Sequence, residues 1–204
     1  MITAIFDLDG TLADTLCDLA DATNYALHTL GYPEHPYEKY NYFVGNGVQK
    51  LCFRALPEDK KDDTDKMLEL FSEYYGEHFL DKTKLYPQIR ETLHKLADSG
   101  VKLAVATNKP ENFAVKITDA LLPEISSKRP KKPDTAILDE IFAALPDEEN
   151  RAFMIGDSNV DIQTGKNAGI ETIGCVWGFR GRQELEDAGA DHIANTADDI
   201  AKFI

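Results

Sequence analysis

Two carboxylates near the start of the chain, Asp7 and Asp9, are the residues whose types and spacing best suit chemistry. They follow the apolar, β-branched run Ile2–Phe6 and precede Gly10 and Thr11, a pattern that predicts a buried strand ending in a turn. Because side chains alternate along a strand, both carboxylates project to the same side. Like charges this close are unfavourable unless a cation or a shared proton lies between them. The pair predicts a metal site or an acid and nucleophile couple, and a plain turn after an edge strand is the alternative.

Polar residues also follow two later predicted strands. Thr107 and Asn108 come after the strand expected at 101–106, and Asp157 and Asp161 come after the one expected at 152–156. A hydroxyl and an amide at a helix start suit phosphate oxygens. Asp157 and Asp161 lie four residues apart at a helix start, so one could bind a cation while the other supports the shell around it. Taken singly, each of these residues also fits helix capping.

A short basic segment, 126–133, carries Lys132 in an otherwise acidic chain. On its own Lys132 is most simply a solvated side chain. A carboxylate attacking a phosphate ester, however, meets repulsion of about 4 kcal/mol per charge pair at about 4 Å and a dielectric of about 20. A lysine and a hard cation held by carboxylates would cancel that repulsion, and oxygen ligands favour Mg²⁺. The groups together predict phosphoryl transfer to an aspartate followed by hydrolysis.

The remaining pattern describes the elements that must position these residues. Strands and helices alternate from about residue 86 onward, which predicts an α/β fold: a Rossmann-like parallel sheet between helices, with polar residues at the carboxyl ends of the strands. Helical spacing without strands interrupts this alternation early in the chain, and predicts an inserted all-helical subdomain with an aromatic stripe as its core. We expect a core domain of residues 1–14 and 82–204 and a cap domain of residues 15–81. The helices expected early in the chain cover 12–30, 37–43, 47–56 and 60–80.

Composition limits the classes of partner. The chain has 204 residues, 43% of them hydrophobic and 28% charged, as in ordinary globular proteins. A formal net charge of -14 argues against binding to nucleic acid or to an anionic membrane. The three cysteines are odd in number and lack metal-ligand spacing, which favours a reducing compartment. There is no basic leader and no long apolar stretch, so we expect a cytoplasmic protein.

The four motifs, in this order and context, resemble those of the haloacid dehalogenase-like hydrolases. The run from Asp7 to Thr15, followed directly by a helical insertion, is similar to the phosphoglycolate phosphatase-like branch of that superfamily. One departure is the short stretch between Asn108 and Lys132, where only residues 124–127 could form the strand that relatives carry there. We therefore expect this edge strand to be missing or vestigial, with Lys132 misplaced and activity reduced.

The resemblance implies a role for each matching carboxylate. Asp7 would be the nucleophile that becomes an aspartyl phosphate. Asp9 would protonate the leaving alkoxide and then activate water, and its main-chain carbonyl would join Asp7 and Asp157 in binding Mg²⁺. Asp161 would order the shell around the metal.

It also implies roles for the remaining polar residues. Thr107 and Asn108 would hold the transferring phosphoryl group. Lys132 would neutralise charge on the nucleophile and the phosphate, and its Lys-Pro step favours it over Lys131. The helical insertion would be a mobile cap that closes on the substrate and excludes water. The stretch Gly45-Asn46-Gly47 lies where such caps carry a substrate-selecting loop, although an ordinary interhelical turn fits it equally well.

The function expected from these features is that of a magnesium-dependent phosphatase acting on a small phosphorylated metabolite, with 2-phosphoglycolate as the candidate, in a monomer or homodimer. A sugar-phosphate mutase of the β-phosphoglucomutase type is the second possibility, although Thr11 is more typical of phosphatases. A weakly active relative that binds phosphate or protein is the third. Dehalogenation is disfavoured because the carboxylates of a magnesium site are retained.

Overall fold

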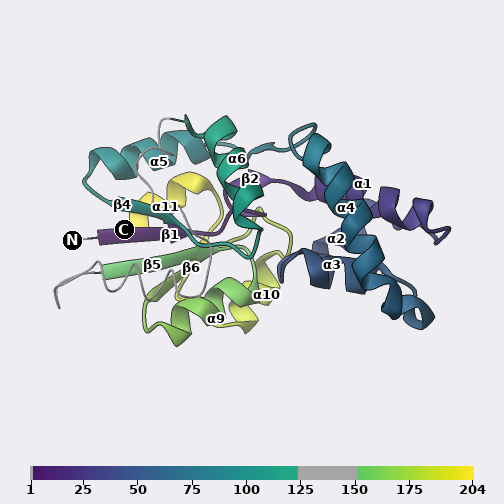
Figure 1. Cartoon of the computed structure of the whole chain (residues 1–204). Helices are drawn as coiled ribbons and strands as arrows, with labels where there is room; N and C mark the ends of the chain where they lie inside the picture. Colours follow the sequence, from purple (N-terminus) through teal and green to yellow (C-terminus); the bar gives the residue numbers. More distant parts are fainter. Residues whose placement is uncertain (1, 124–150) are drawn as a thin grey trace. The chain divides into compact units, whose positions relative to one another are not determined.

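The computed structural model of the chain describes residues 2–123 and 151–204 (Figure 1). These residues form two compact units, one of Met1–Ala13 with Leu85–Ile204 and one of Asp14–Lys84, called here the core unit and the helical unit. The edge strand considered at 124–127, the helix expected from Asp134 and the motif residue Lys132 lie outside the described residues.

The core unit is built on a parallel sheet of five strands in the order β4-β1-β5-β6-β7. The predicted α/β fold with a parallel sheet is therefore confirmed. The first strand lies between two others and its residues from Thr3 to Phe6 are buried, as its β-branched sequence predicts. The strands are β1 (Ile2–Phe6), β4 (Lys102–Val105), β5 (Arg151–Gly156), β6 (Glu171–Cys175) and β7 (His192–Ala194).

Helices cover both faces of this sheet. Figure 1 shows α5 and α11 on one face and α9 and α10 on the other, and the packing between these helices and the strands agrees with that arrangement. Connections from a strand through a helix to the next parallel strand produce this layering. The helices described in this unit are α5 (Ile89–Asp98), α6 (Glu111–Leu121), α9 (Asn159–Asn167), α10 (Arg182–Asp187) and α11 (Ala197–Phe203).

The strand register brings three chain segments to the same level. Phe6, the last residue of β1, pairs with Val105 of β4 on one side and with Ile155 of β5 on the other. The pairing extends past the strands, because the Asp7 amide donates to the Ile155 carbonyl at 2.9 Å. Residues that follow β1, β4 and β5 therefore meet at one edge of the sheet.

The helical unit contains α1 (Leu16–Thr29), α2 (Tyr37–Phe43), α3 (Val48–Ala55), the 3-10 helix η1 (Glu58–Asp63) and α4 (Thr64–His78). The aromatic stripe is core, as predicted, since Phe71 and Tyr75 are buried with ring centroids 5.1 Å apart. The expected single helix over 60–80 is wrong at its start. Residues 58–63 are all charged and none is buried, so the segment has no apolar face that would favour an α-helix by burial.

Two very short strands, β2 (Ala13–Asp14) and β3 (Lys84–Leu85), pair where the chain passes between the units. Nearby, buried Asp18 accepts hydrogen bonds from the amides of Lys82 and Thr83 at 3.0 and 2.8 Å. The sequence pattern did not predict these strands, because two residues carry no readable periodicity.

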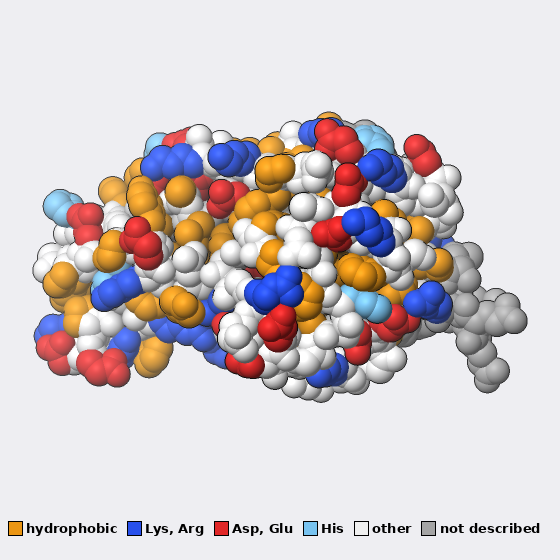
Figure 2. Space-filling model, turned by 180° about the vertical axis from the view of Figure 1, so that it is seen from behind, with side chains coloured by type: hydrophobic (Ala, Val, Ile, Leu, Met, Phe, Trp, Pro, Cys, Tyr) orange, Lys and Arg blue, Asp and Glu red, His pale blue; other side chains and the backbone are white. Residues whose placement is uncertain are grey.

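The surface carries charges of both signs. On the face shown in Figure 2, Lys and Arg side chains are interspersed with Asp and Glu. Among the described residues, no helix has both the length and the apolar character that crossing a membrane requires.

Candidate active site

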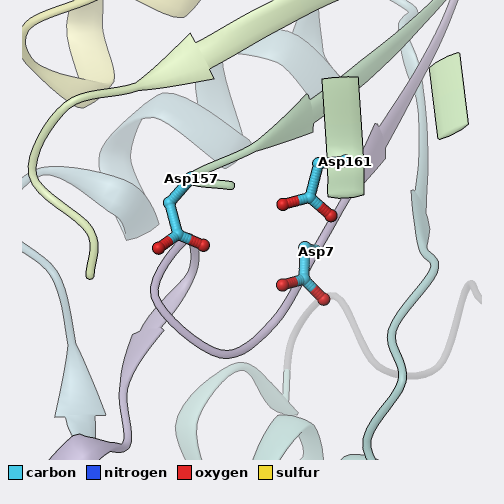
Figure 3. Close-up of side chains that lie close together, drawn as sticks. All are labelled: Asp7, Asp157 and Asp161. Atoms are coloured by element: carbon cyan, nitrogen blue, oxygen red, sulfur yellow. The ribbon is translucent and has the colours of Figure 1, made fainter. Parts of the chain in front are cut away.

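Three carboxylates converge at the edge of the sheet where β1 and β5 end. Asp7 follows β1, Asp157 follows β5, and Asp161 lies in the first turn of α9. One oxygen of each lies within 4.8 Å of the others, and Figure 3 shows the three groups facing a common space. Asp157 and Asp161 are buried and Asp7 is half-buried. This arrangement concentrates negative charge where little water can screen it.

The surroundings of these carboxyls favour their protonated forms. Desolvation, with repulsion from the neighbouring carboxylates, holds the pKa of Asp7 well above its ordinary value, although a hydrogen bond with Thr107 acts in the opposite direction. Desolvation and repulsion from Asp161 raise the pKa of Asp157 to about 8. Desolvation raises the pKa of Asp161 to about 6. A cation among the three would reverse these shifts, because opposite charge stabilises the ionised forms.

Close contacts with two loops position the Asp157 carboxylate. Its Oδ2 accepts the Phe179 amide at 2.7 Å, and its Oδ1 accepts the Thr11 hydroxyl at 3.4 Å. A Cβ on Gly178 would lie 2.2 Å from the Asp157 Cβ, and one on Gly10, where φ is +87°, would lie 2.5 Å from Oδ2. Only glycine leaves room for this carboxylate. The roles of Gly178 and Phe179 were not predicted from the sequence, where the one signal is a glycine shortly after β6.

Asp161 caps α9 and also belongs to the carboxylate cluster. Its Oδ2 accepts the Ser158 amide at 3.1 Å and the Ser158 hydroxyl at 2.7 Å. The Asp161 amide in turn donates to the Ser158 side chain, and the reciprocal amide contacts form a capping box at the start of α9. Gly156 permits this approach, because a Cβ there would lie 2.2 Å from the Asp161 Cβ. Capping therefore positions Asp161 rather than excluding it from the cluster.

Asp9 has a different partner. Its carboxylate accepts both hydrogen bonds of a two-point contact with the Lys109 ammonium, at 2.9 Å to Oδ1 and 3.3 Å to Oδ2. Lys109 was not predicted as a site residue, although it directly follows Thr107 and Asn108. The available signal was its position beside two residues already assigned to the site.

The other predicted site residues are distributed as follows. Thr107 lies beside Asp7 and also accepts the Lys109 amide at 3.3 Å, and Asn108 lies between Thr107 and Lys109 in the segment before α6. Lys132 lies outside the described residues. These placements put Thr107 at the carboxylate cluster.

The loop Gly45-Asn46-Gly47 belongs to the helical unit. Arg54 donates to the Asn46 side-chain oxygen at 2.6 Å and to the Phe43 carbonyl at 2.9 Å, so it ties the loop to the end of α2. Gly45 and Gly47 have φ values of 114° and 84°, which favour glycine. The loop thus has a defined conformation within its own unit.

The donor set of the cluster suits a hard divalent cation. All three groups offer oxygen, and none is a thiolate or imidazole that would favour a softer metal. The raised pKa values show that the protein alone compensates these charges incompletely. The residues present therefore fit an oxygen-ligated cation.

Comparisons with known proteins agree with this geometry. A phosphoglycolate phosphatase of Vibrio parahaemolyticus is 31% identical over 216 residues, covering 98% of this chain and 94% of the relative. One from Psychrobacter arcticus is 38% identical over 197 residues, covering 89% and 86%. The crystal structure of a predicted phosphoglycolate phosphatase from Haemophilus somnus matches with a TM-score of 0.84 and 28% identity, covering 98% and 96%. The family model described as haloacid dehalogenase-like hydrolase matches residues 4–175, and the chain belongs to that family.

Proposed function

We propose that this protein is a magnesium-dependent phosphatase that hydrolyses a small phosphate monoester, with 2-phosphoglycolate as the candidate substrate. The observation that carries the proposal is the convergence of Asp7, Asp157 and Asp161 at one sheet edge, with Asp9 two residues beyond Asp7. The relatives named phosphoglycolate phosphatases, which match most of the chain, support the choice of substrate.

In the proposed reaction Asp7 is the nucleophile. A carboxylate oxygen of Asp7 bonds to phosphorus while the bond from phosphorus to the ester oxygen breaks, and Asp9 gives a proton to that leaving oxygen. Water then attacks the aspartyl phosphate and passes a proton to Asp9, which releases inorganic phosphate and restores both residues. Thr107, which hydrogen-bonds Asp7, is suited to bind a phosphoryl oxygen beside the nucleophile.

A Mg²⁺ ion would be held by the side chains of Asp7, Asp157 and Asp161, with the main-chain carbonyl of Asp9 as a further ligand. When bound, it would offset the repulsion between the nucleophile and the phosphate oxygens. We further propose that Asn108 and Lys132 contact the phosphoryl group.

We also propose the division of labour between the units. The core unit would carry out the chemistry, and the helical unit would act as the cap. The loop Gly45-Asn46-Gly47 would select the substrate, and the hydrogen bonds from Arg54 would keep it ordered.

The test is release of inorganic phosphate from 2-phosphoglycolate and a panel of other small phosphate esters, with and without Mg²⁺. The protein should be active only with the metal, and Asp7→Asn should lower the rate by at least about a thousandfold because the amide is a poor nucleophile. Asp98→Asn, an exposed substitution at the end of α5 in the same unit, is the matched control and should retain full activity. Full activity of Asp7→Asn would refute the proposal.

Two further readouts separate the alternatives. Beryllium fluoride should form an adduct on Asp7 that fluorine NMR detects, and the Asp7→Asn variant should not form it. Isomerised hexose phosphate in place of free phosphate would indicate a mutase. Intact Mg²⁺ binding without turnover of any ester would indicate a binding protein.

A further inference from the structure

Lys109 is a buried cation beside the predicted proton donor. Its side chain is 2% exposed, and the side chain of its partner Asp9 is 13% exposed. Several other pairs between lysines and carboxylates are more open. For example, the Lys95 side chain, which pairs with Asp198 at 2.6 Å, is 59% exposed. Because a buried ammonium is costly unless paired, Lys109 depends on Asp9 for its place in the structure.

The dependence also runs in the other direction. The backbone around Asp9 is fixed by a tight turn. In this turn the Gly10 amide donates to the Ala13 carbonyl at 2.9 Å, and Asp9 and Ala13 form an isolated β-bridge. The remaining freedom of Asp9 is rotation of its carboxylate. The two-point contact from Lys109 restricts that rotation, because one ammonium faces both oxygens.

The path of the chain explains how this contact forms. Lys109 follows β4, and Asp9 follows the neighbouring strand β1, so the parallel register brings them together although they are 100 positions apart. Pro110 and the start of α6 come directly after Lys109 and direct the chain away from the sheet. The lysine is therefore placed by the same strand ends that place Asp7.

We infer that Lys109 is a positioning residue that holds the Asp9 carboxylate in the orientation its proton transfers require. The inference rests on the proposed function, in which Asp9 gives a proton to the leaving oxygen and then takes one from water. Geometry of this kind contributes strongly to rate, and a small misplacement of a catalytic group costs up to about 100-fold. Lys109 then acts on the steps that need a proton from or to Asp9, and not on the bond between Asp7 and phosphorus.

This role gives a kinetic signature that loss of packing would not. Nitrophenolate leaves without a proton, whereas an alkoxide needs one. In Lys109→Met, the pre-steady-state burst of nitrophenolate from p-nitrophenyl phosphate should persist, while steady-state kcat falls about 10- to 100-fold because Asp9 still has to activate water. With 2-phosphoglycolate, kcat should fall by a similar factor, the burst should be absent and KM should change little.

Three variants complete the test. Lys109→Arg keeps the charge and should recover part of kcat, and Lys95→Met, which removes the exposed pair, should match the wild type. In an Asp9→Asn background, Lys109→Met should have no additional effect, because Lys109 acts through Asp9. Calorimetry checks that each variant is folded. If Lys109→Met does not fold, the kinetics of Lys109→Arg decide the test.

Each outcome decides the inference. An unchanged kcat in Lys109→Met, additive effects with Asp9→Asn, or loss of the nitrophenolate burst from p-nitrophenyl phosphate would overturn it. So would a rise in KM for 2-phosphoglycolate alone, which would assign Lys109 to binding the substrate carboxylate. A wild-type protein without phosphatase activity overturns the proposed function and this inference together, whereas an active wild type with an indifferent Lys109→Met overturns this inference only.

Discussion

Asp157 in the core unit and Asp18 in the helical unit are equally buried, each 2% exposed, but they have opposite kinds of partner. Asp18 accepts hydrogen bonds from the Lys82 amide and from both the amide and the hydroxyl of Thr83, all between 2.7 and 3.0 Å. Asp157 accepts one short amide hydrogen bond and faces two other carboxylates. A buried acid whose donors come from the protein serves the fold, whereas one that faces other acids requires a partner from outside.

The largest expected effect comes from neutralising the acid that faces other acids. Asp157→Asn should weaken Mg²⁺ binding and phosphatase activity by at least about 100-fold, because a charged ligand is lost. The metal-free variant should nevertheless be at least as stable as the wild type, with a gain on the order of 1 kcal/mol, because repulsion with Asp7 and Asp161 is removed. Calorimetric Mg²⁺ titration and urea unfolding in EDTA measure both quantities. A variant that is less stable than the wild type and binds Mg²⁺ with unchanged affinity would show that Asp157 serves the fold, as Asp18 does.

The satisfied acid should respond in the opposite way. Asp18→Ala should lower the free energy of unfolding by about 3 kcal/mol, because three donors of Lys82 and Thr83, two of them on buried Thr83, lose their acceptor. Urea unfolding measures the change, and Mg²⁺ affinity of the core unit should be unaffected. The control is Asp59→Ala, which removes an exposed pair with Lys60 and should change stability by less than about 0.5 kcal/mol. If both variants changed the free energy of unfolding equally, the hydrogen bonds of Asp18 would contribute no more to stability than an exposed ion pair.

The sequence predicts best what depends on short-range pattern. The buried run Ile2–Phe6 and the alternation of strands and helices indicated the parallel sheet, and the sheet has that form. The strand ends also indicated that polar residues would gather at one edge, and the structure brings Asp7, Asp157 and Asp161 together there. This inference needs only the rule that parallel strands end at the same edge.

Contacts between distant segments could not be predicted in the same way. The contact between Lys109 and Asp9 depends on strand register. The close approach of Gly178 to Asp157, and the hydrogen bond from the Phe179 amide, depend on loop packing. The one local signal of Lys109 is its position directly after Thr107 and Asn108, and nothing else in the sequence distinguishes it from a solvated lysine. The charged segment 58–63 misled the prediction for a related reason. Lys61 donates to the Phe53 carbonyl at 2.7 Å and Asp63 accepts the Tyr32 hydroxyl, and the local sequence pattern indicates neither contact.

The carboxylate cluster also predicts how stability depends on pH. Because the folded pKa values of Asp7, Asp157 and Asp161 are raised, their favourable contribution is complete below about pH 4 and is lost as pH rises through about 6 and about 8. Carboxyls with lowered pKa values, such as Asp199 at about 2, act only below about pH 4. In EDTA the free energy of unfolding should therefore fall between pH 5 and 8.

Mg²⁺ should reverse that fall, since the metal competes with protons for the same oxygens. Urea unfolding at each pH, with and without Mg²⁺, measures the difference, and stabilisation by the metal should grow with pH. Asp161→Asn is the matched variant and should show a shallower profile in EDTA. A profile that is flat in EDTA for the wild type would mean that the three carboxyls are already compensated within the protein.

The smallest expected effect separates stability of the helical unit from the site. Gly76 lies inside α4, and an added Cβ would meet nothing within 4 Å, so Gly76→Ala should raise the free energy of unfolding by about 0.7 kcal/mol through helix propensity. Gly100 is equally open but has φ +84°, so Gly100→Ala should lower it by about 1 kcal/mol. Urea unfolding measures both changes, and neither variant should alter Mg²⁺ affinity. If Gly76→Ala weakened the binding of Mg²⁺, the helical unit would contribute to the metal site, and the contrast between a unit that serves the fold and one that holds the ion would fail.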